Sequence, residues 1–203
     1  MASPGELVAV MADSLGVSRA TVAQYDRALA ENGLRSSGGR GLSAAKVTAA
    51  DAANLLIAIM GAPISGAPIK DAARTCKLYG ALRYRIGNRP KIPSHEVFKR
   101  LGDLPATHTF HKALVTLIDG AAEVDSISAD ELGLDVQLTG PFHRARIIAQ
   151  PPAVLDSTKW ATLTYLGRGD GLERRDFGLR QSREVRFRTI WQIAATLKQA
   201  GPL

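Results

Sequence analysis

The stretch LGVSRATVAQYDRALAENGLRSSGGRG, residues 15–41, carries hydrogen-bonding side chains at helical spacing. On a helix that starts at Ser18, the apolar positions form one stripe and leave Arg19 and Gln24 on the outward side. An arginine can bond two atoms of a guanine, and a glutamine can bond two atoms of an adenine, so both are candidates for reading bases. Ser18 and Thr21 can hold phosphate oxygens through their hydroxyls and the backbone N–H groups of the helix start. These types and spacings indicate recognition of a nucleic acid.

The other side chains do not indicate enzyme chemistry. The sequence holds no G-x-S-x-G, HExxH or P-loop pattern and no close Ser/His/Asp grouping. His108 and His111 have a spacing that can bind metal, but without a nearby cysteine or second His pair we expect two helix-surface histidines. Cys76 lacks a defined base, so we expect a structural role. We therefore expect no catalytic residue, no metal and no cofactor.

The net charge of +7 favours an anionic partner, and nucleic acid is the commonest one. The charge is unevenly placed along the chain. Residues 1–62 hold five Lys/Arg and five Asp/Glu, residues 63–105 hold nine against three, and residues 106–140 hold one against six. Residues 141–203 hold eleven against five. The basic character therefore lies mostly outside the candidate base-reading stretch.

The composition is that of an intracellular globular protein. The longest apolar run, AANLLIAIMGAPI, is shorter than the roughly 20 residues that a membrane helix needs. The first residues show no basic segment followed by an apolar core, which a secretory signal would have. The single cysteine excludes an internal disulfide framework and suits a reducing compartment. We expect a cytoplasmic protein with no membrane partner.

Local signals predict three helices in the first part of the chain. Gly16 is a typical helix C-terminal residue, and Thr48 with Asp51 has the spacing of a capping box. GAPISGAPI, residues 61–69, is the best linker candidate. The predicted helices span 5–16, 18–32 and 48–60.

Beyond the linker, the pattern changes from helical spacing to alternation after residue 133. We expect Thr189 to be the N-cap of an amphipathic C-terminal helix, preceded by a short strand. The predicted elements are basic helices at 70–86 and 94–104, a stronger helix at 107–124, strands at 134–140, 143–150 and 159–167, and the strand and helix of 183–199.

The spacing of three small or branched residues carries a family resemblance. Ala12 lies four positions before Gly16, and Val22 lies six after it. With these offsets, segment 5–34 resembles the helix-turn-helix of bacterial and phage transcription regulators. The glycine/arginine hairpin RSSGGRG and the helix that follows look like the winged arrangement of mercury-resistance-type (MerR-like) regulators. The same order occurs in the small terminases, the DNA-recognition subunits of phage packaging machines.

The resemblance covers about 60 of the 203 residues. Regulators of the MerR type usually continue with a long coiled-coil helix, which GAPISGAP prevents here. The resemblance is therefore to the module alone.

The resemblance implies that the second helix lies in the major groove of DNA. In the wing, the glycines let the backbone approach closely, and Arg40 can enter a minor groove or meet a phosphate. With only five cations in the first 62 residues, this unit needs dimerisation or a basic second unit to bind tightly. The predicted DNA-binding residues are Ser18, Arg19, Ala20, Thr21, Gln24, Arg27, Arg35 and Arg40.

A second basic segment, KLYGALRYRIGNRPK, interleaves cations with tyrosines, as segments that follow a nucleic-acid backbone do. The alternative is a solvated basic helix whose tyrosines serve the core. The predicted auxiliary phosphate contacts are Lys77, Arg83, Arg85 and Arg89.

Together these observations predict an α+β protein. An N-terminal all-α winged helix-turn-helix at 1–62 precedes a basic helical linker region at 63–105. A mixed α+β oligomerisation or effector domain with a small antiparallel sheet follows at 106–203. The expected function is sequence-specific binding of double-stranded DNA, as a transcriptional regulator of bacterial or phage type. Trp191 on the last helix fits a core or an interface of a homodimer or higher homo-oligomer. The alternatives are a packaging adaptor similar to a small terminase and a protein-interaction or inhibitor protein that does not touch DNA.

Overall fold

The computed structural model describes residues 2–38, 46–63, 66–85, 96–125, 129, 132–149, 161–167 and 180–199. Within these ranges the chain is α+β, as expected. The helices are α1 (Pro4–Leu15), α2 (Arg19–Glu31), α3 (Ala49–Met60), α4 (Ala72–Gly80), α5 (Glu96–Gly102), α6 (Phe110–Ala121) and α8 (Phe187–Gln199). The strands are β1 (Arg83–Tyr84), β2 (Leu134–Gly140), β3 (Arg144–Ala149), β4 (Ala161–Leu166) and β5 (Gln181–Arg186).

The five strands form one antiparallel sheet in the order β1-β4-β3-β2-β5. Because side chains alternate along a strand, each strand gives one set to the core and the other set to the opposite face. In β2, for example, Leu134, Val136 and Leu138 are buried, whereas the residues between them are partly exposed. The sheet therefore has one apolar face and one polar face.

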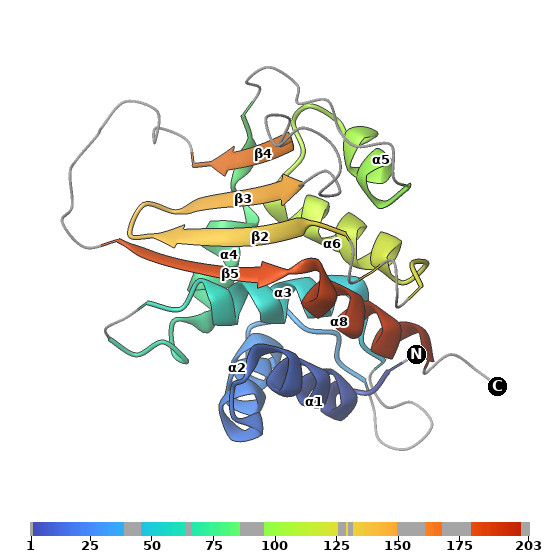
Figure 1. Ribbon diagram of the computed structural model, residues 1–203. Helices are drawn as coiled ribbons and strands as arrows, with labels where there is room; N and C mark the ends of the chain where they lie inside the picture. The colour runs from blue at the N-terminus through green and yellow to red at the C-terminus, as the bar shows by residue number, and fades with distance from the viewer. Residues whose placement is uncertain are drawn as a thin grey trace.

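The helices gather on the apolar face of the sheet. Figure 1 shows α3, α4 and α6 behind the strands, with α1 and α2 beyond the β5 edge. Helix α8 continues directly from β5 and packs against α1 and α6. The polar face is not covered by any described helix.

Helix α3 is the centre of the helical layer. Nine of its twelve residues are buried, and it packs against α2, α4 and α6. At its C-terminus the chain passes very close to α4, since a Cβ on Gly61 would lie 2.7 Å from side-chain atoms of Thr75 and Tyr79. Glycine is thus required at position 61 for this helix contact.

Three local expectations are wrong. The helix predicted for 70–86 ends at Gly80, and the chain then forms the edge strand β1. The C-terminal helix begins at Phe187, so Thr189 lies inside it and is not its N-cap. His108 precedes α6 and is only 8% exposed, so it is not a helix-surface histidine. In each case contacts with distant segments outweigh the local pattern.

The hydrophobic core is continuous from Ala2 to Ala194 in the described chain. It crosses residues 62/63 and 105/106, where the sequence suggested boundaries. Helix α1 of the first expected unit packs on α8 of the third, and α3 packs on α4 and α6. The core itself shows no division at these positions.

Candidate nucleic-acid interface

Helices α1 and α2 are joined by a three-residue turn at residues 16–18. Gly16 has φ 64° and ψ 31°, the left-handed conformation that costs glycine no steric strain. The N–H groups of Gly16 and Val17 both donate to the Ala12 carbonyl and close the end of α1. Ser18 then caps α2 by accepting a hydrogen bond from the Thr21 N–H at 3.2 Å. These contacts fix a sharp bend between the two helices.

The inner face of α2 holds the helix against the rest of the protein. Val22 is fully buried and Ala12 on α1 is 3% exposed, where the two helices pack. Tyr25 and Leu29 continue the buried stripe toward α3. The side of α2 that can meet a ligand is therefore set by these four residues.

The outer face of α2 is open to solvent among the described residues. Ala20, Gln24 and Arg27 are exposed and lie opposite the buried stripe at helical spacing. Arg19 is exposed on the flank, where its guanidinium lies 3.7 Å from the Asp13 carboxylate. Gln24 and Arg27 thus stand more directly outward than Arg19 does.

Ser18 and Thr21 lie at the start of α2, as expected, but their hydroxyls form a hydrogen bond with each other. The two oxygens are 2.9 Å apart. Thr21 is half-buried and also lines a small hollow beside the helix. Its hydroxyl therefore points to the flank of α2, while Ser18 remains exposed.

Arg35 is engaged inside the protein. Its Nε lies 3.0 Å from Asp26 Oδ1, with the two side chains 18% and 11% exposed. Burial raises the pKa of Asp26, and the neighbouring Arg35 charge opposes that rise. Among the predicted contacts within the described chain, Arg35 alone has a buried anionic partner, so it presents less positive charge outward than the sequence suggested.

The segment after α2 is tied to α3 by Asp51. This buried carboxylate accepts hydrogen bonds from the backbone N–H and the hydroxyl of both Ser36 and Thr48, at 2.6–2.9 Å. Asn54 adds a bond from its side-chain amide to the Leu34 carbonyl. The expected capping box at Thr48 and Asp51 is confirmed, and the same carboxylate also anchors the chain that leads toward the expected wing. Arg40 lies outside the described residues.

Of the auxiliary cations in the described chain, Arg83 and Arg85 lie far from α2, whereas Lys77 belongs to α4, which packs against α2. Lys77 is exposed on α4, and Arg83 and Arg85 are exposed at β1. β1 is at one edge of the sheet, while α2 and the opposite edge strand β5 line the same small hollow. Four strand spacings of about 4.8 Å separate the two edges by about 19 Å. Arg89 lies outside the described residues.

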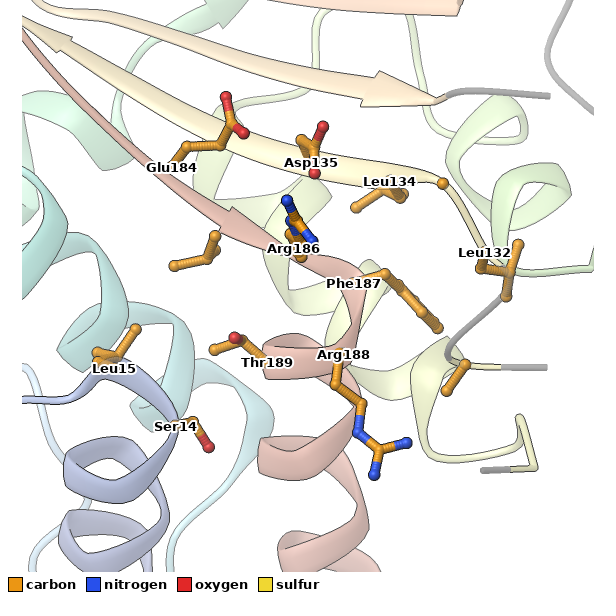
Figure 2. A pocket seen from close by; sticks show the side chains of 13 residues that line it. Ser14, Leu15, Leu132, Leu134, Asp135, Glu184, Arg186, Phe187, Arg188 and Thr189 are labelled. Carbon is orange, nitrogen blue, oxygen red and sulfur yellow. The ribbon is translucent and has the colours of Figure 1, made fainter. Parts of the chain in front are cut away.

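Hollows also lie on the described surface near α1 and α2. One, of about 490 Å³, lies between α2, the end of α3 and β5, and Arg183 beside it donates to the Ile59 carbonyl at 2.6 Å. Another, of about 950 Å³, lies between the end of α1, β2, β5 and the start of α8. Figure 2 shows Arg186 on β5 beside Asp135 on β2, with Arg188 directed away from them. None of the residues lining either hollow is a histidine or cysteine, so neither holds a nucleophile paired with a histidine base.

The Cys76 thiol and the His108 imidazole have internal partners. The buried Cys76 thiol donates to Asn54 Oδ1 at 3.2 Å, and burial raises its pKa to about 12, which agrees with a structural role. His108 Nδ1 lies 2.7 Å from the Pro105 carbonyl and Nε2 lies 2.9 Å from the Tyr165 hydroxyl. Since a carbonyl only accepts, Nδ1 carries the proton and Nε2 accepts from the tyrosine. In the described chain no group of three or more His, Cys, Asp and Glu could hold a metal ion.

Comparisons with protein-family models, with curated proteins and with solved structures found no match to this chain. Of the helices that the structure describes, none has both the length and the apolar character needed to cross a membrane.

Proposed function

We propose that this protein binds double-stranded DNA sequence-specifically through α2, as a transcriptional regulator of bacterial or phage type. The observation that carries the proposal is the outer face of α2. Its small and hydrogen-bonding residues Ala20, Gln24 and Arg27 are exposed, at a helix whose inner face is packed and whose start is fixed by a left-handed glycine turn. This is the arrangement that a recognition helix needs to enter a major groove.

The spacing of these residues suits base reading. Gln24 and Arg27 are three residues apart, or about 4.5 Å along the helix axis, so they reach neighbouring base pairs. Ala20 presents no bulk to the groove. Glu31 shares this side at the far end of α2, where phosphate repulsion favours entry of the N-terminal half of the helix.

The test begins with selection of bound fragments from random duplex DNA. On the selected site, Gln24→Ala and Arg27→Ala should each weaken binding by about 1–3 kcal/mol, or roughly 5- to 150-fold, and relax the preference at one position. Arg27→Lys keeps the charge but loses the paired hydrogen bonds, so it should lose preference while retaining salt-dependent affinity.

Lys112→Ala is the charge-matched control for Arg27→Ala. It also removes one exposed cation, but from α6 and not from the outer face of α2. Selection that enriches no sequence, or α2 variants that bind like the parent protein, would refute the proposal. Light scattering measures the number of subunits in the assembly. A dimer agrees with a regulator that reads two half-sites, whereas eight or more subunits favour a packaging adaptor.

A further inference from the structure

One half of the polar face of the sheet carries four arginines, at β1 and on β3, with β4 between these two strands. Tyr84 pairs with Tyr165 and both are buried, so their neighbours Arg83, Arg85 and Leu166 belong to the opposite face. Arg144 pairs with Leu166 and Arg146 with Thr164 on that same face. We call Arg83, Arg85, Arg144 and Arg146 the arginine face.

The positive charge of this face is not cancelled by nearby strands. β1, β3 and β4 contain no Asp or Glu. The acids of the polar face stand on β2 and β5, where Asp135 lies opposite Arg186 and Glu184 opposite Gln137. The sheet surface is therefore divided into a cationic half and a mixed half.

The arginines are available for a ligand. Arg83, Arg85 and Arg144 are exposed, and Arg146 is partly exposed. Among the described residues neither Arg144 nor Arg146 forms an ion pair, and the buried Nε of Arg146 has no hydrogen-bond partner. Arg83 donates one bond to the Thr107 carbonyl at 3.3 Å.

The chemistry of the face fits a phosphate backbone. Residues two positions apart on one strand, such as Arg144 and Arg146, are separated by about 7 Å. β1 and β3 are two strand spacings, or about 10 Å, apart. The arginines thus form a broad array of guanidinium donors. On β4, Thr164 lies between Arg85 and Arg146, and Leu166 lies between Arg83 and Arg144. The outward positions of the described strands hold no aromatic residue, so this face offers no stacking platform for unpaired bases. That favours a duplex over a single strand.

We propose that the arginine face binds the phosphate backbone of double-stranded DNA, independently of sequence and of α2. The protein then has two DNA-contacting surfaces, one on the polar face of β1 and β3 and the other on α2, beyond the β5 edge. A sequence-independent surface also supplies the electrostatic affinity that the neutral N-terminal residues lack.

The test measures binding of random-sequence duplex DNA by the full chain over a series of salt concentrations. Arg144→Ala/Arg146→Ala should make the negative slope of log K against log salt shallower by about 1.8, because each phosphate contact contributes about 0.9. The corresponding loss at 0.1 M salt is about 60-fold relative to 1 M. Arg144→Lys/Arg146→Lys should keep the slope, since the charges remain.

Arg186→Ala is the matched control, because it removes one arginine from the same sheet face, beside Asp135. It should leave the slope nearly unchanged. The proposal is overturned if the double alanine variant keeps the parent slope, or if Arg186→Ala changes the slope by about 0.9, as the loss of one phosphate contact would. It is also overturned if the double variant weakens binding of single-stranded RNA but not of duplex DNA.

Failure of this proposal is distinguishable from failure of the α2 site. Gln24→Ala should leave random-sequence binding unchanged and weaken only the selected site. The double alanine variant should weaken both kinds of DNA by the same factor. Circular dichroism and thermal unfolding of each variant check that the fold is retained.

Discussion

His108 illustrates how a single buried residue contributes to stability. It lies among Tyr84, Phe110 and Tyr165, stacked on the Tyr84 ring at 5.1 Å and hydrogen-bonded at both ring nitrogens. Burial lowers the pKa of His108, and burial likewise lowers the pKa of His111. Both imidazoles are therefore neutral in the folded protein at neutral pH.

This burial predicts a pH dependence of folding. The unfolded chain has histidine pKa values near 6.5 and binds more protons than the folded chain below that pH. The stability is thus fully present above pH 6.5 and is lost as the pH falls through and below it. The thermal midpoint should be lower at about pH 5.5 than at about pH 7.5. His108→Gln, which keeps both hydrogen-bonding functions without the charge, should reduce that difference; an unchanged difference would contradict the assignment.

At the level of elements, Asp51 joins two helices. It caps α3 through Thr48 and also holds Ser36 in the segment that leaves α2. A buried carboxylate with four donors around it leaves those donors unsatisfied when it is removed. Asp51 therefore adds a hydrogen-bonded tie to the direct packing of α2 against α3.

Asp51→Ala should lower the free energy of unfolding by about 2–3 kcal/mol, measured by urea denaturation. Asp71→Ala is the matched control, because Asp71 stands at the N-cap of α4 but makes no side-chain cap bond. It should change stability by less than about 0.5 kcal/mol. Equal losses in the two variants would show that Asp51 acts only as a general helix-start charge.

For the whole molecule, the continuous core makes the N-terminal helices dependent on the rest of the chain. α3 is buried by α4 and α6 as well as by α2, and α1 packs on α8. An isolated segment 1–62 would expose the buried side of α3 to water, at a cost of about 25 cal/mol per Å² of apolar surface. The arrangement of α1, α2 and α3 is thus held in place by elements far along the sequence.

We therefore expect the fragment 1–62 to show no cooperative thermal unfolding, whereas the full chain should unfold in a single calorimetric transition. Circular dichroism of the fragment and calorimetry of the chain provide the measurement. A fragment that unfolds cooperatively, with the helix content of α1, α2 and α3, would instead support a boundary at residue 62.

The sequence by itself determined the local features of this protein. Gly16, Ser18 and the Thr48–Asp51 pair predicted where helices end and begin, and Val22 predicted the inner face of α2. These caps and turns form between residues a few positions apart, so a short stretch of sequence is enough to predict them. The outward positions of Gln24 and Arg27 follow from the same helical period.

Only the tertiary structure decided which distant residues meet. In the structure, Arg35 pairs with Asp26 and His108 is buried beside Tyr165. The predicted basic helix ends early, and the chain after it forms β1. The tertiary structure also places Arg83 and Arg85 across β4 from Arg144 and Arg146, although about 60 residues separate the two pairs in sequence. Strand order and register arise from burial of one sheet face against the helices, and no periodicity within a single segment encodes that choice.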